Sequence, residues 1–302
     1  MKIVIAGGSG FLGSALTKFY NIKGHNVVVL TRGKAHQHDN VRWVRWDGVN
    51  EGDWVEELRD ADVLINLAGK NVSCRYNEEN KNEILRSRVD SVRVLSKGLS
   101  RWSRRVPLWI QASSATIYRH AEDRPMTEAD GEVGDRFSVE VCRAWEAAFE
   151  DVREADRKII MRTSIVLGED DGAFPRLVRL SRFGLGGKMG DGNQYVSWLH
   201  INDFTRMINW FIQNENACGT YNCTAPRPLT NRELMTRIAR KTSPLLRLPG
   251  PVWILRLGAI LIGTETELVL KSRWVLPRRL EQEGFTFGHP NIEDALESLI
   301  KV

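Results

Sequence analysis

The chain has 302 residues, of which 42% are hydrophobic, and its 43 basic and 38 acidic residues give a formal charge of +5. A chain of this length and composition can bury a substantial core, which excludes an intrinsically disordered protein. The two signs of charge are spread through the sequence, so the small basic excess predicts no nucleic-acid partner.

The cysteine pattern and the apolar stretches limit the cellular context. The four cysteines contain no CxxC pair, so we expect no metal site, no disulfide framework and a reducing, cytoplasmic environment. The N-terminal apolar residues run into a glycine-rich turn without a cleavage region, which argues against a secretory signal. The later stretch 252–262 contains Arg256 and is too short to span a bilayer, so it predicts a buried helix and no membrane association.

The first 13 residues contain the clearest motif. Lys2 to Ala6 is an apolar segment typical of a buried parallel strand, and Gly7, Gly10 and Gly13 then recur at steps of three into a helical pattern. The first glycine permits a sharp exit from the strand, the second admits a pyrophosphate and the third lets the helix pack closely. This turn predicts a phosphate-binding site at a helix N-terminus.

The next apolar run completes a βαβ unit and selects the cofactor. Leu12, Leu16 and Phe19 share one helical face, and residues 27–30 form the second strand. Sites for NAD usually end this strand with an acidic residue, whereas the 2′-phosphate of NADP requires an arginine. Thr31 and Arg32 stand here, so we expect NADP(H).

Further strands bring small and polar residues to the same edge. Residues 41–46 predict a third strand that ends before Asp47, whose carboxylate either meets the adenine amino group or serves the turn. Residues 63–67 predict a fourth strand, and Leu67, Ala68 and Gly69 at its carboxyl end would let backbone approach the cofactor.

The following helices and strands extend the alternation. Residues 80–99 predict a helix on which Glu83 and Arg88 either face the sheet edge or are solvated. A fifth strand at 108–112 delivers Ser114 and Tyr118 to the edge where chemistry would occur, although a serine there also commonly caps a turn. A helix at 138–152 and a strand at 158–163 follow, and together these elements predict an α/β fold with a Rossmann doubly wound parallel sheet.

The pattern changes near Gly172. We expect a dinucleotide-binding domain over residues 1–172 and a smaller mixed α/β domain over 173–302, some segments of which return to the sheet. Asn202 is a candidate N-cap for the next helix, and Thr230 with Glu233 forms a capping box.

Several of these motifs resemble one known family. AGGSGFLG, the NLAG at residues 66–69, the SSATIY at 113–118 and GDGNQYVSWLHINDF at 190–204 resemble the extended short-chain dehydrogenase/reductases, and the resemblance covers nearly the whole chain. LGG at 185–187, WLHI at 198–201 and VLPRRL at 275–280 are similar to an atypical subgroup, the NAD-dependent epimerase/dehydratase-like "epimerase family", whose members have a distinctive C-terminal domain.

The resemblance implies a set of residues that bind NADP(H). It includes the whole glycine turn, the end of the second strand and three charged residues farther along the chain. Together with the residues inferred above, the expected cofactor-binding set is Gly7, Gly10, Phe11, Leu12, Gly13, Thr31, Arg32, Asp47, Leu67, Ala68, Gly69, Glu83, Arg88 and Arg162.

The chain departs from the family at its acid/base pair. Active members need a tyrosine with a lysine four residues later, whose ammonium lowers the pKa of the tyrosine. Aligning on Glu146 places Ser138 at the tyrosine position and Cys142 at the lysine position, so we expect the dyad to be absent. Ser114 matches the catalytic serine of the family, and Tyr118 is either a replacement acid or a packing residue.

Residues 197–200 of the second domain bear on the kind of substrate. Ser197 and Trp198 stand where many sugar-nucleotide enzymes have an arginine, and Trp198 with His200 would line an aromatic pocket on the substrate side unless His200 is a buried structural residue. The leading interpretation is an NADP(H)-binding protein, with hydride transfer to an unidentified small molecule if it is an enzyme. The alternatives are a nucleotide-sugar epimerase or dehydratase and a non-catalytic NADP(H)-sensing or assembly protein.

Overall fold

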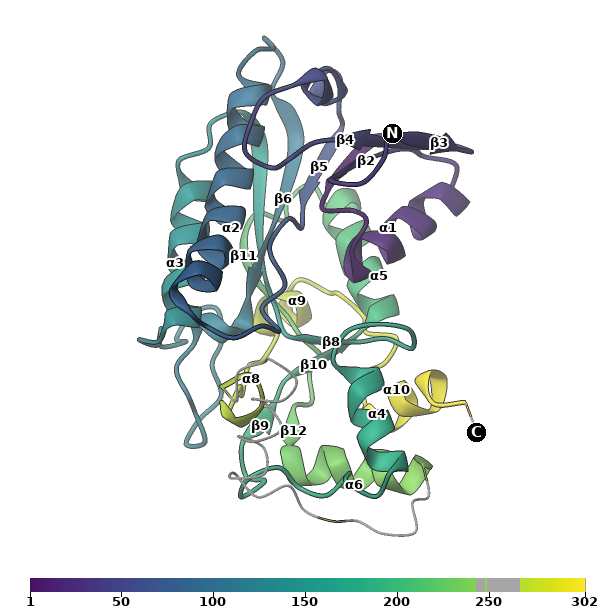
Figure 1. The fold of residues 1–302 in the computed structure, drawn as a ribbon, viewed down its shortest axis with the longest axis vertical. Helices are drawn as coiled ribbons and strands as arrows, with labels where there is room; N and C mark the ends of the chain where they lie inside the picture. The colour runs from purple at the N-terminus through teal and green to yellow at the C-terminus, as the bar shows by residue number, and fades with distance from the viewer. Residues whose placement is uncertain (243–247, 249–266, 302) are drawn as a thin grey trace.

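The computed structural model describes residues 1–242, 248 and 267–301 (Figure 1). The helix predicted at 252–262 lies outside these residues. Within them, no helix combines the length and the apolar character needed to cross a membrane.

One eight-stranded sheet organises the upper lobe. Its strand order is β11-β7-β6-β5-β1-β2-β4-β3, and every neighbouring pair is parallel except β3 with β4. The strands are β1 (Lys2–Ala6), β2 (Asn26–Thr31), β3 (His36–His38), β4 (Val41–Arg45), β5 (Val63–Asn66), β6 (Val106–Ser114), β7 (Ala155–Thr163) and β11 (Gly219–Cys223). The predicted Rossmann doubly wound sheet is therefore confirmed.

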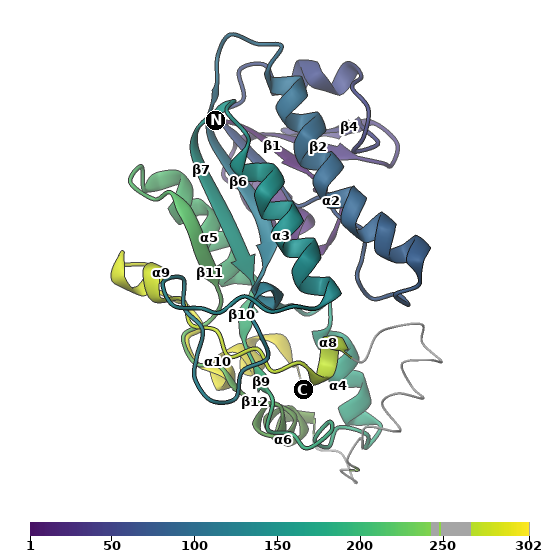
Figure 2. The same cartoon turned by 90° about the vertical axis from the view of Figure 1, so that its left-hand side faces the viewer.

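Helices cover both faces of this sheet (Figures 1 and 2). Side chains alternate along each strand, so Ile3 and Ile5 of β1 pack on one side while Val4 and Ala6 pack on the other. The first side meets α1 (Phe11–Ile22) and α5 (Ile201–Gln213), and the second meets α2 (Glu78–Leu99), α3 (Phe137–Glu150) and the 3₁₀ helix η1 (Asp53–Leu58). Both faces of the sheet are thus buried, as a parallel sheet requires.

The chain enters the second lobe and returns before it ends. After β7, residues 165–200 build the first part of the lower lobe, and α5 and β11 then rejoin the sheet. The lower lobe contains β8 (Ile165–Leu167) beside β10 (Trp198–His200), β9 (Tyr195–Val196) beside β12 (Leu229–Thr230), and the helices α4 (Phe174–Arg182), α6 (Asn231–Thr242), α8 (Glu267–Leu270), α9 (Arg278–Gln282) and α10 (Ile292–Leu299).

The two predicted helix caps have different outcomes. Thr230 and Glu233 exchange hydrogen bonds between side chain and backbone, at 3.3 Å from the Glu233 N–H and 2.9 Å from the Thr230 N–H, so the capping box is confirmed. The prediction for Asn202 is wrong, because α5 begins earlier and its N-cap is His200. The His200 imidazole Nδ1 accepts the Asn202 backbone N–H at 3.0 Å and thereby takes the place of a side-chain oxygen.

Candidate functional site

The glycine turn joins β1 to α1 at the carboxyl edge of the sheet. Gly7 has a φ of +74°, and a Cβ there would lie 2.9 Å from backbone atoms of Ala68. A Cβ on Gly13 would lie 2.4 Å from the Gly8 Cα, so α1 packs directly on the turn. These two glycines are required by the close approach of backbone to backbone.

Gly10 is different, because the protein leaves space above it. Among the described residues, a Cβ there would meet only the Gly7 carbonyl oxygen, at an ordinary 3.7 Å. Gly10 is also the N-cap of α1, where no side chain caps the helix and no acidic residue lies in the first turn. Open space beside uncapped N–H groups fits the diphosphate of a dinucleotide, whose negative charge the helix N-terminus would stabilise.

A cavity of about 710 Å³ lies in front of this turn. It extends from the glycines to the ends of β2, β4 and β5 and to one side of α2. Its lining includes nine of the fourteen residues expected to bind the cofactor, namely Gly7, Gly10, Thr31, Arg32, Asp47, Leu67, Ala68, Gly69 and Glu83.

The end of β2 places a cation at the cavity. Thr31 is buried, and its hydroxyl donates to the Ser9 Oγ at 3.1 Å while accepting the Gly33 N–H at 3.1 Å. These bonds fix the turn that follows β2. Arg32 is exposed at that turn and makes no hydrogen bond or ion pair with a described residue. Its guanidinium therefore faces a potential ligand without competition from a described carboxylate.

Asp47 borders the cavity but serves its own loop. Its Oδ1 accepts the backbone N–H groups of Val49 and Asn50, both at 2.8 Å, and its Oδ2 accepts the Asn50 side-chain amide at 2.8 Å. Hydrogen bonds from Asn50 are the main cause of the lowered pKa of this carboxyl. The structure thus favours the turn role over the adenine contact.

A buried amide shapes the edge at Leu67–Gly69. Asn66 ends β5 and is fully buried; its Nδ2 donates to Ser91 Oγ and Gln111 Oε1 at 3.1 Å, and its Oδ1 accepts the Ala68 N–H at 3.0 Å. Satisfying all these groups holds the Ala68 backbone against Gly7. The sequence motif predicted this edge, but it gave no signal for the hydrogen bonds beneath it.

Lys70 and Ser9 also reach the cavity, although the sequence interpretation missed them. The Lys70 ammonium pairs with Glu83 and donates to Asn80 Oδ1 at 2.8 Å. Glu83 is thus the partner of a lysine in the cavity wall rather than an isolated acid. The position of Lys70 directly after the NLAG motif was the available signal.

Four expected residues have other contacts. The Arg88 guanidinium donates to the carbonyls of Lys70 and Ile84, at 3.1 and 2.9 Å, and lies over the Trp145 ring. Arg88 therefore supports Gly69 from behind. The Phe11 ring fills the space above Gly168, and Leu12 packs on the sheet core. The side chains of Phe11 and Leu12 thus pack within the protein, Arg88 holds backbone carbonyls through hydrogen bonds, and Arg162 is held in an ion pair. Contact of these four residues with the cofactor stays a prediction.

That ion pair lies behind the end of β6. Arg162 forms two hydrogen bonds with the Glu146 carboxylate, at 3.0 and 2.8 Å, and a third with the Tyr118 hydroxyl at 3.0 Å. The Tyr118 hydroxyl in turn donates to Asn222 Oδ1 at 2.8 Å, and the residue is only 2% exposed. Of the two roles expected for Tyr118, the structure favours the packing residue, because burial raises the pKa of this phenol and its hydroxyl is bound to both Asn222 and Arg162.

Ser114 remains accessible at the end of β6. Its Oγ accepts the Thr116 N–H at 3.3 Å and has a long contact of 3.5 Å to the Thr163 carbonyl. It is also the N-cap of the 3₁₀ helix η2 (Ala115–Ile117). Capping and catalysis are compatible roles for this hydroxyl.

The α3 helix carries neither a tyrosine nor a lysine. Ser138 donates to Glu267 Oε1 at 2.8 Å. Cys142 is buried, and burial together with Glu146 raises the pKa of its thiol to about 12, so it is not a ready nucleophile. In the described part of the chain, no cluster of histidine, cysteine or carboxylate side chains suits a metal ion.

The structure favours the buried, structural alternative for His200 and places Trp198 in the core of the lower lobe rather than at a pocket. Trp198 is fully buried, and its indole N–H donates to the Arg227 carbonyl at 3.1 Å. His200 is 1% exposed, shares a hydrogen bond of 2.9 Å with Ser298 and stacks on His289 at 3.7 Å. The Trp198 ring packs in the apolar core of the lower lobe, and the His200 ring caps the start of α5.

Comparisons with known proteins agree with this architecture. The model described as the NAD dependent epimerase/dehydratase family matches residues 3–224. The chain belongs to that family. A second model, for a domain of unknown function (DUF1731), matches residues 251–299, which include the segment that follows α8.

Relatives span the whole chain. The "Epimerase family protein YfhF" of Bacillus subtilis is 32% identical, with 99% of this chain and 98% of that protein aligned. The crystal structure of the human epimerase family protein SDR39U1 with NADPH has a TM-score of 0.85 at 26% identity and covers 99% of both chains. A nucleoside-diphosphate sugar epimerase from Corynebacterium glutamicum has a TM-score of 0.78 at 30% identity, covering 99% of this chain and 58% of that one.

The glycine turn yields a matched pair of variants. We expect Gly10→Ala to weaken dinucleotide binding tenfold or more, since the added methyl group occupies the space above the turn, while unfolding free energy changes by no more than about 1 kcal/mol. Gly13→Ala should instead lower the unfolding free energy by about 1–3 kcal/mol through overpacking on Gly8. Calorimetric titration and urea denaturation measure the two quantities, and an unchanged affinity in Gly10→Ala would contradict this reading of the turn.

His200 predicts a pH dependence of stability. Burial, with a smaller effect of His289, lowers the pKa of His200 from 6.5 to about 4. The unfolded chain therefore binds this proton more readily than the folded one. The contribution of His200 to the free energy of unfolding is complete above pH 6.5 and decreases as the pH falls toward 4, by up to about 3 kcal/mol. His200→Asn keeps a cap acceptor for α5 but cannot titrate. Its urea midpoint should change less between pH 6.5 and 4 than that of wild type or of the exposed His38→Asn control; equal slopes would refute the assignment.

Proposed function

We propose that this protein binds NADP(H) in the cavity in front of the glycine turn. The observation that carries the proposal is Arg32, an exposed guanidinium at the end of β2 with no described carboxylate to neutralise it. An arginine at this position suits a 2′-phosphate, whereas NAD sites usually have an acidic residue here. The NADPH in the human relative's crystal structure supports the same choice of cofactor.

The residues around the cavity have separate roles in this proposal. The Gly10 turn and the N-terminus of α1 would hold the diphosphate, Arg32 the 2′-phosphate, and the backbone at Ala68 would approach the rest of the dinucleotide. Bound NADPH would supply a hydride. Ser114 at the end of β6 would then orient a substrate oxygen by hydrogen bonding.

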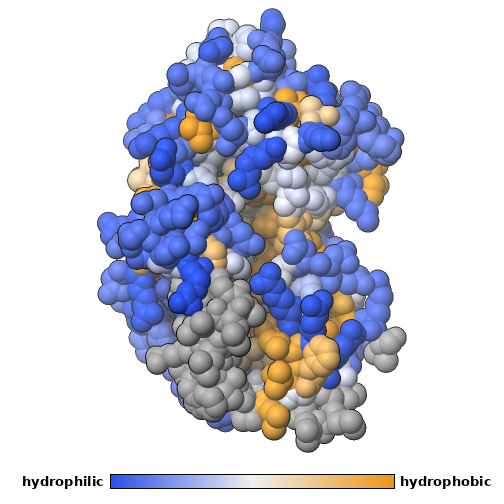
Figure 3. Space-filling view, in the orientation of Figure 1, coloured by the Kyte–Doolittle hydropathy of each residue, from blue (hydrophilic) through white to orange (hydrophobic). Residues whose placement is uncertain are grey.

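The reaction that fits best is hydride transfer between NADP(H) and a small carbonyl or imine compound in the cytoplasm. Figure 3 supports a small-molecule substrate, since apolar surface is visible in the hollow between the two lobes, with hydrophilic side chains around it. The four cysteines are free, in keeping with a reducing compartment. Because α3 has no tyrosine or lysine, we propose that the protein works without the usual dyad.

Family membership favours a second candidate, an epimerase acting on a sugar nucleotide. A relative that carries this name, the Corynebacterium glutamicum protein, is 30% identical. The two reactions differ in their hydride balance: an oxidoreductase consumes the cofactor with its substrate, whereas an epimerase returns the hydride and leaves the cofactor unchanged. Net oxidation of NADPH, followed by its absorbance, separates them.

Arg32→Ala tests the cofactor proposal. We expect the Kd for NADPH to rise tenfold or more, because a charge-assisted hydrogen bond contributes about 1.5–3 kcal/mol, while the Kd for NADH stays within about twofold. Arg104→Ala is the matched control, since this exposed arginine lies before β6 at the opposite edge of the sheet. Equal losses for NADPH and NADH, or wild-type binding that does not distinguish them, would disprove the role of Arg32.

A further inference from the structure

A short segment after α8, residues 271–276, runs from the lower lobe past the end of β6. Ser272 donates its N–H to His120 Nδ1 at 3.1 Å and its hydroxyl to the Ala121 carbonyl at 2.6 Å. On the other side, the Ser197 hydroxyl donates to the Arg273 carbonyl at 2.8 Å and accepts the Val275 N–H at 2.9 Å. The segment is therefore held on two sides.

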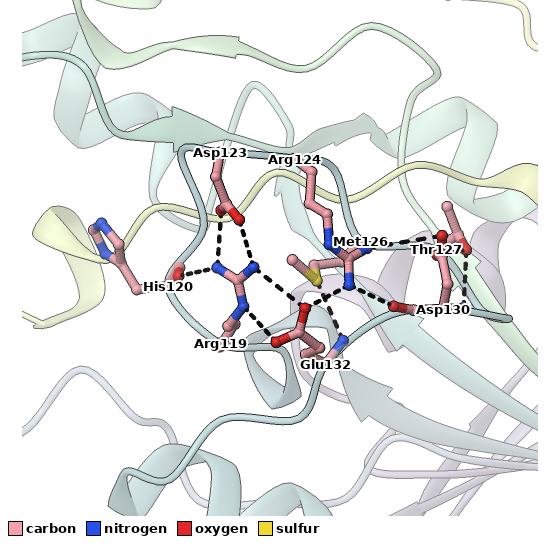
Figure 4. A network of polar contacts seen from close by, with 8 residues as sticks. All are labelled: Arg119, His120, Asp123, Arg124, Met126, Thr127, Asp130 and Glu132. Atoms are coloured by element: carbon pink, nitrogen blue, oxygen red, sulfur yellow. Dashed lines mark hydrogen bonds and ion pairs between the residues drawn. The ribbon is translucent and has the colours of Figure 1, made fainter.

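The loop that holds one side is itself stiffened by charge (Figure 4). Arg119 bonds to both oxygens of Asp123, at 2.9 and 2.7 Å, and to Glu132 at 3.0 Å, and Arg124 pairs with the same Glu132. At Met126 the loop exchanges backbone hydrogen bonds with residues 274 and 276, at 2.7 and 3.0 Å. Bidentate contacts of this kind fix loop geometry, so the 271–276 segment has a defined position.

This position brings two cations to the residues that follow Ser114. The Lys271 ammonium donates to the Thr116 carbonyl at 2.7 Å, and the Arg273 guanidinium donates to Thr116 Oγ1 at 3.3 Å. The Thr116 N–H donates to Ser114 Oγ at 3.3 Å. Lys271 and Ser114 are thus both bound to the backbone of Thr116, although 157 positions separate the first from the second in sequence.

Among the described residues, the Lys271 ammonium has few partners for a buried charge. The residue is 6% exposed, and an ammonium has three donors, of which one has a partner among the described residues. Burial, followed by repulsion from Arg273, lowers the pKa of this ammonium to about 8, so it is still mostly charged at neutral pH. A buried charge held by one neutral carbonyl is costly unless a ligand completes its shell.

The charged residues around Lys271 indicate whether its ligand is an anion or a cation. Among the described residues, Arg273 and Arg136 repel Lys271, and Glu267 is the carboxylate that acts on it. One Glu267 oxygen already accepts the Ser138 hydroxyl. Around the neighbouring Cys142, the charges that act on the thiol are Arg88 and Lys271 and one carboxylate, Glu146, which Arg162 pairs. The described cations outnumber the carboxylates here, so the local potential attracts anions.

We propose that Lys271 binds the anionic group, a carboxylate or a phosphate, of the substrate beside Ser114. The substrate class is then a small acid, with its charged oxygens on Lys271 and its reacting oxygen near Ser114. This assignment rests on the proposed function only in treating the Ser114 edge as the place of reaction. It also gives the C-terminal domain a role, because Lys271 lies within the stretch matched by the domain of unknown function.

Calorimetric titration of oxalate and of inorganic phosphate into the full-length, NADP⁺-saturated protein tests the anion site. We expect at least one of the two to bind saturably with one site per chain, and the stronger binder distinguishes a carboxylate ligand from a phosphate ligand. Lys271→Met should weaken that binding tenfold or more, whereas Lys271→Arg, which keeps the charge, should retain most of it. Lys241→Met on the exposed side of α6 is the matched control and should bind as wild type.

Two further measurements keep the outcomes separate. NADPH affinity, measured on the same variants, should stay within twofold in Lys271→Met; a wild type that binds the anion but not NADPH would overturn the proposed function alone. Glu267→Gln covers the case in which Lys271→Met does not fold, since removing a negative charge should tighten anion binding severalfold. Failure of both anions to bind wild type, unchanged binding in Lys271→Met, or weaker binding in Glu267→Gln would refute the site.

Discussion

The close packing of the glycine turn on α1 is the constraint on which the rest of the site depends. A Cβ on Gly13 would overlap Gly8, and one on Gly7 would press on Ala68, so β1, α1 and the edge of β5 meet with no side chain between them. This contact points the uncapped N-terminus of α1 into the cavity. The other residues that line the cavity, among them Arg32 and Lys70, lie around this N-terminus.

Much of this arrangement could be predicted from the sequence because it is local. The glycine spacing, the alternation of strands and helices and the arginine after β2 each depend on a few adjacent residues, and the sheet they predict is confirmed. Short elements were missed for the same reason. The β3 strand, residues 36–38, has no apolar pattern, and its stability comes from pairing with β4 and from His36 stacking on Trp43 at 4.2 Å.

For residues whose role depends on distant partners, the sequence left the choice between chemistry and packing open or favoured the wrong one. Trp198 and His200 belong to a motif rich in aromatic rings, which suggested a pocket, but their neighbours come from residues near 227 and 298. Tyr118 follows the serine motif, yet its hydroxyl is committed to Asn222 and Arg162. In each case burial, which the local sequence does not specify, decides between chemistry and packing.

The inner face of α3 shows how the site and the C-terminal segment depend on each other. On this helix Glu146 is tied to Arg162, and Cys142 is buried with a raised thiol pKa, so neither supplies a charge to the Ser114 edge. Ser138 instead contacts Glu267, the residue one helical turn before Lys271. The buried residues of α3 include no cation, and Arg143 on this helix is exposed, so α3 alone would give the serine edge little stabilisation of a developing or bound negative charge. The C-terminal segment brings Lys271 to the end of β6 beside Ser114, so in this proposal the second lobe supplies a binding residue to the site.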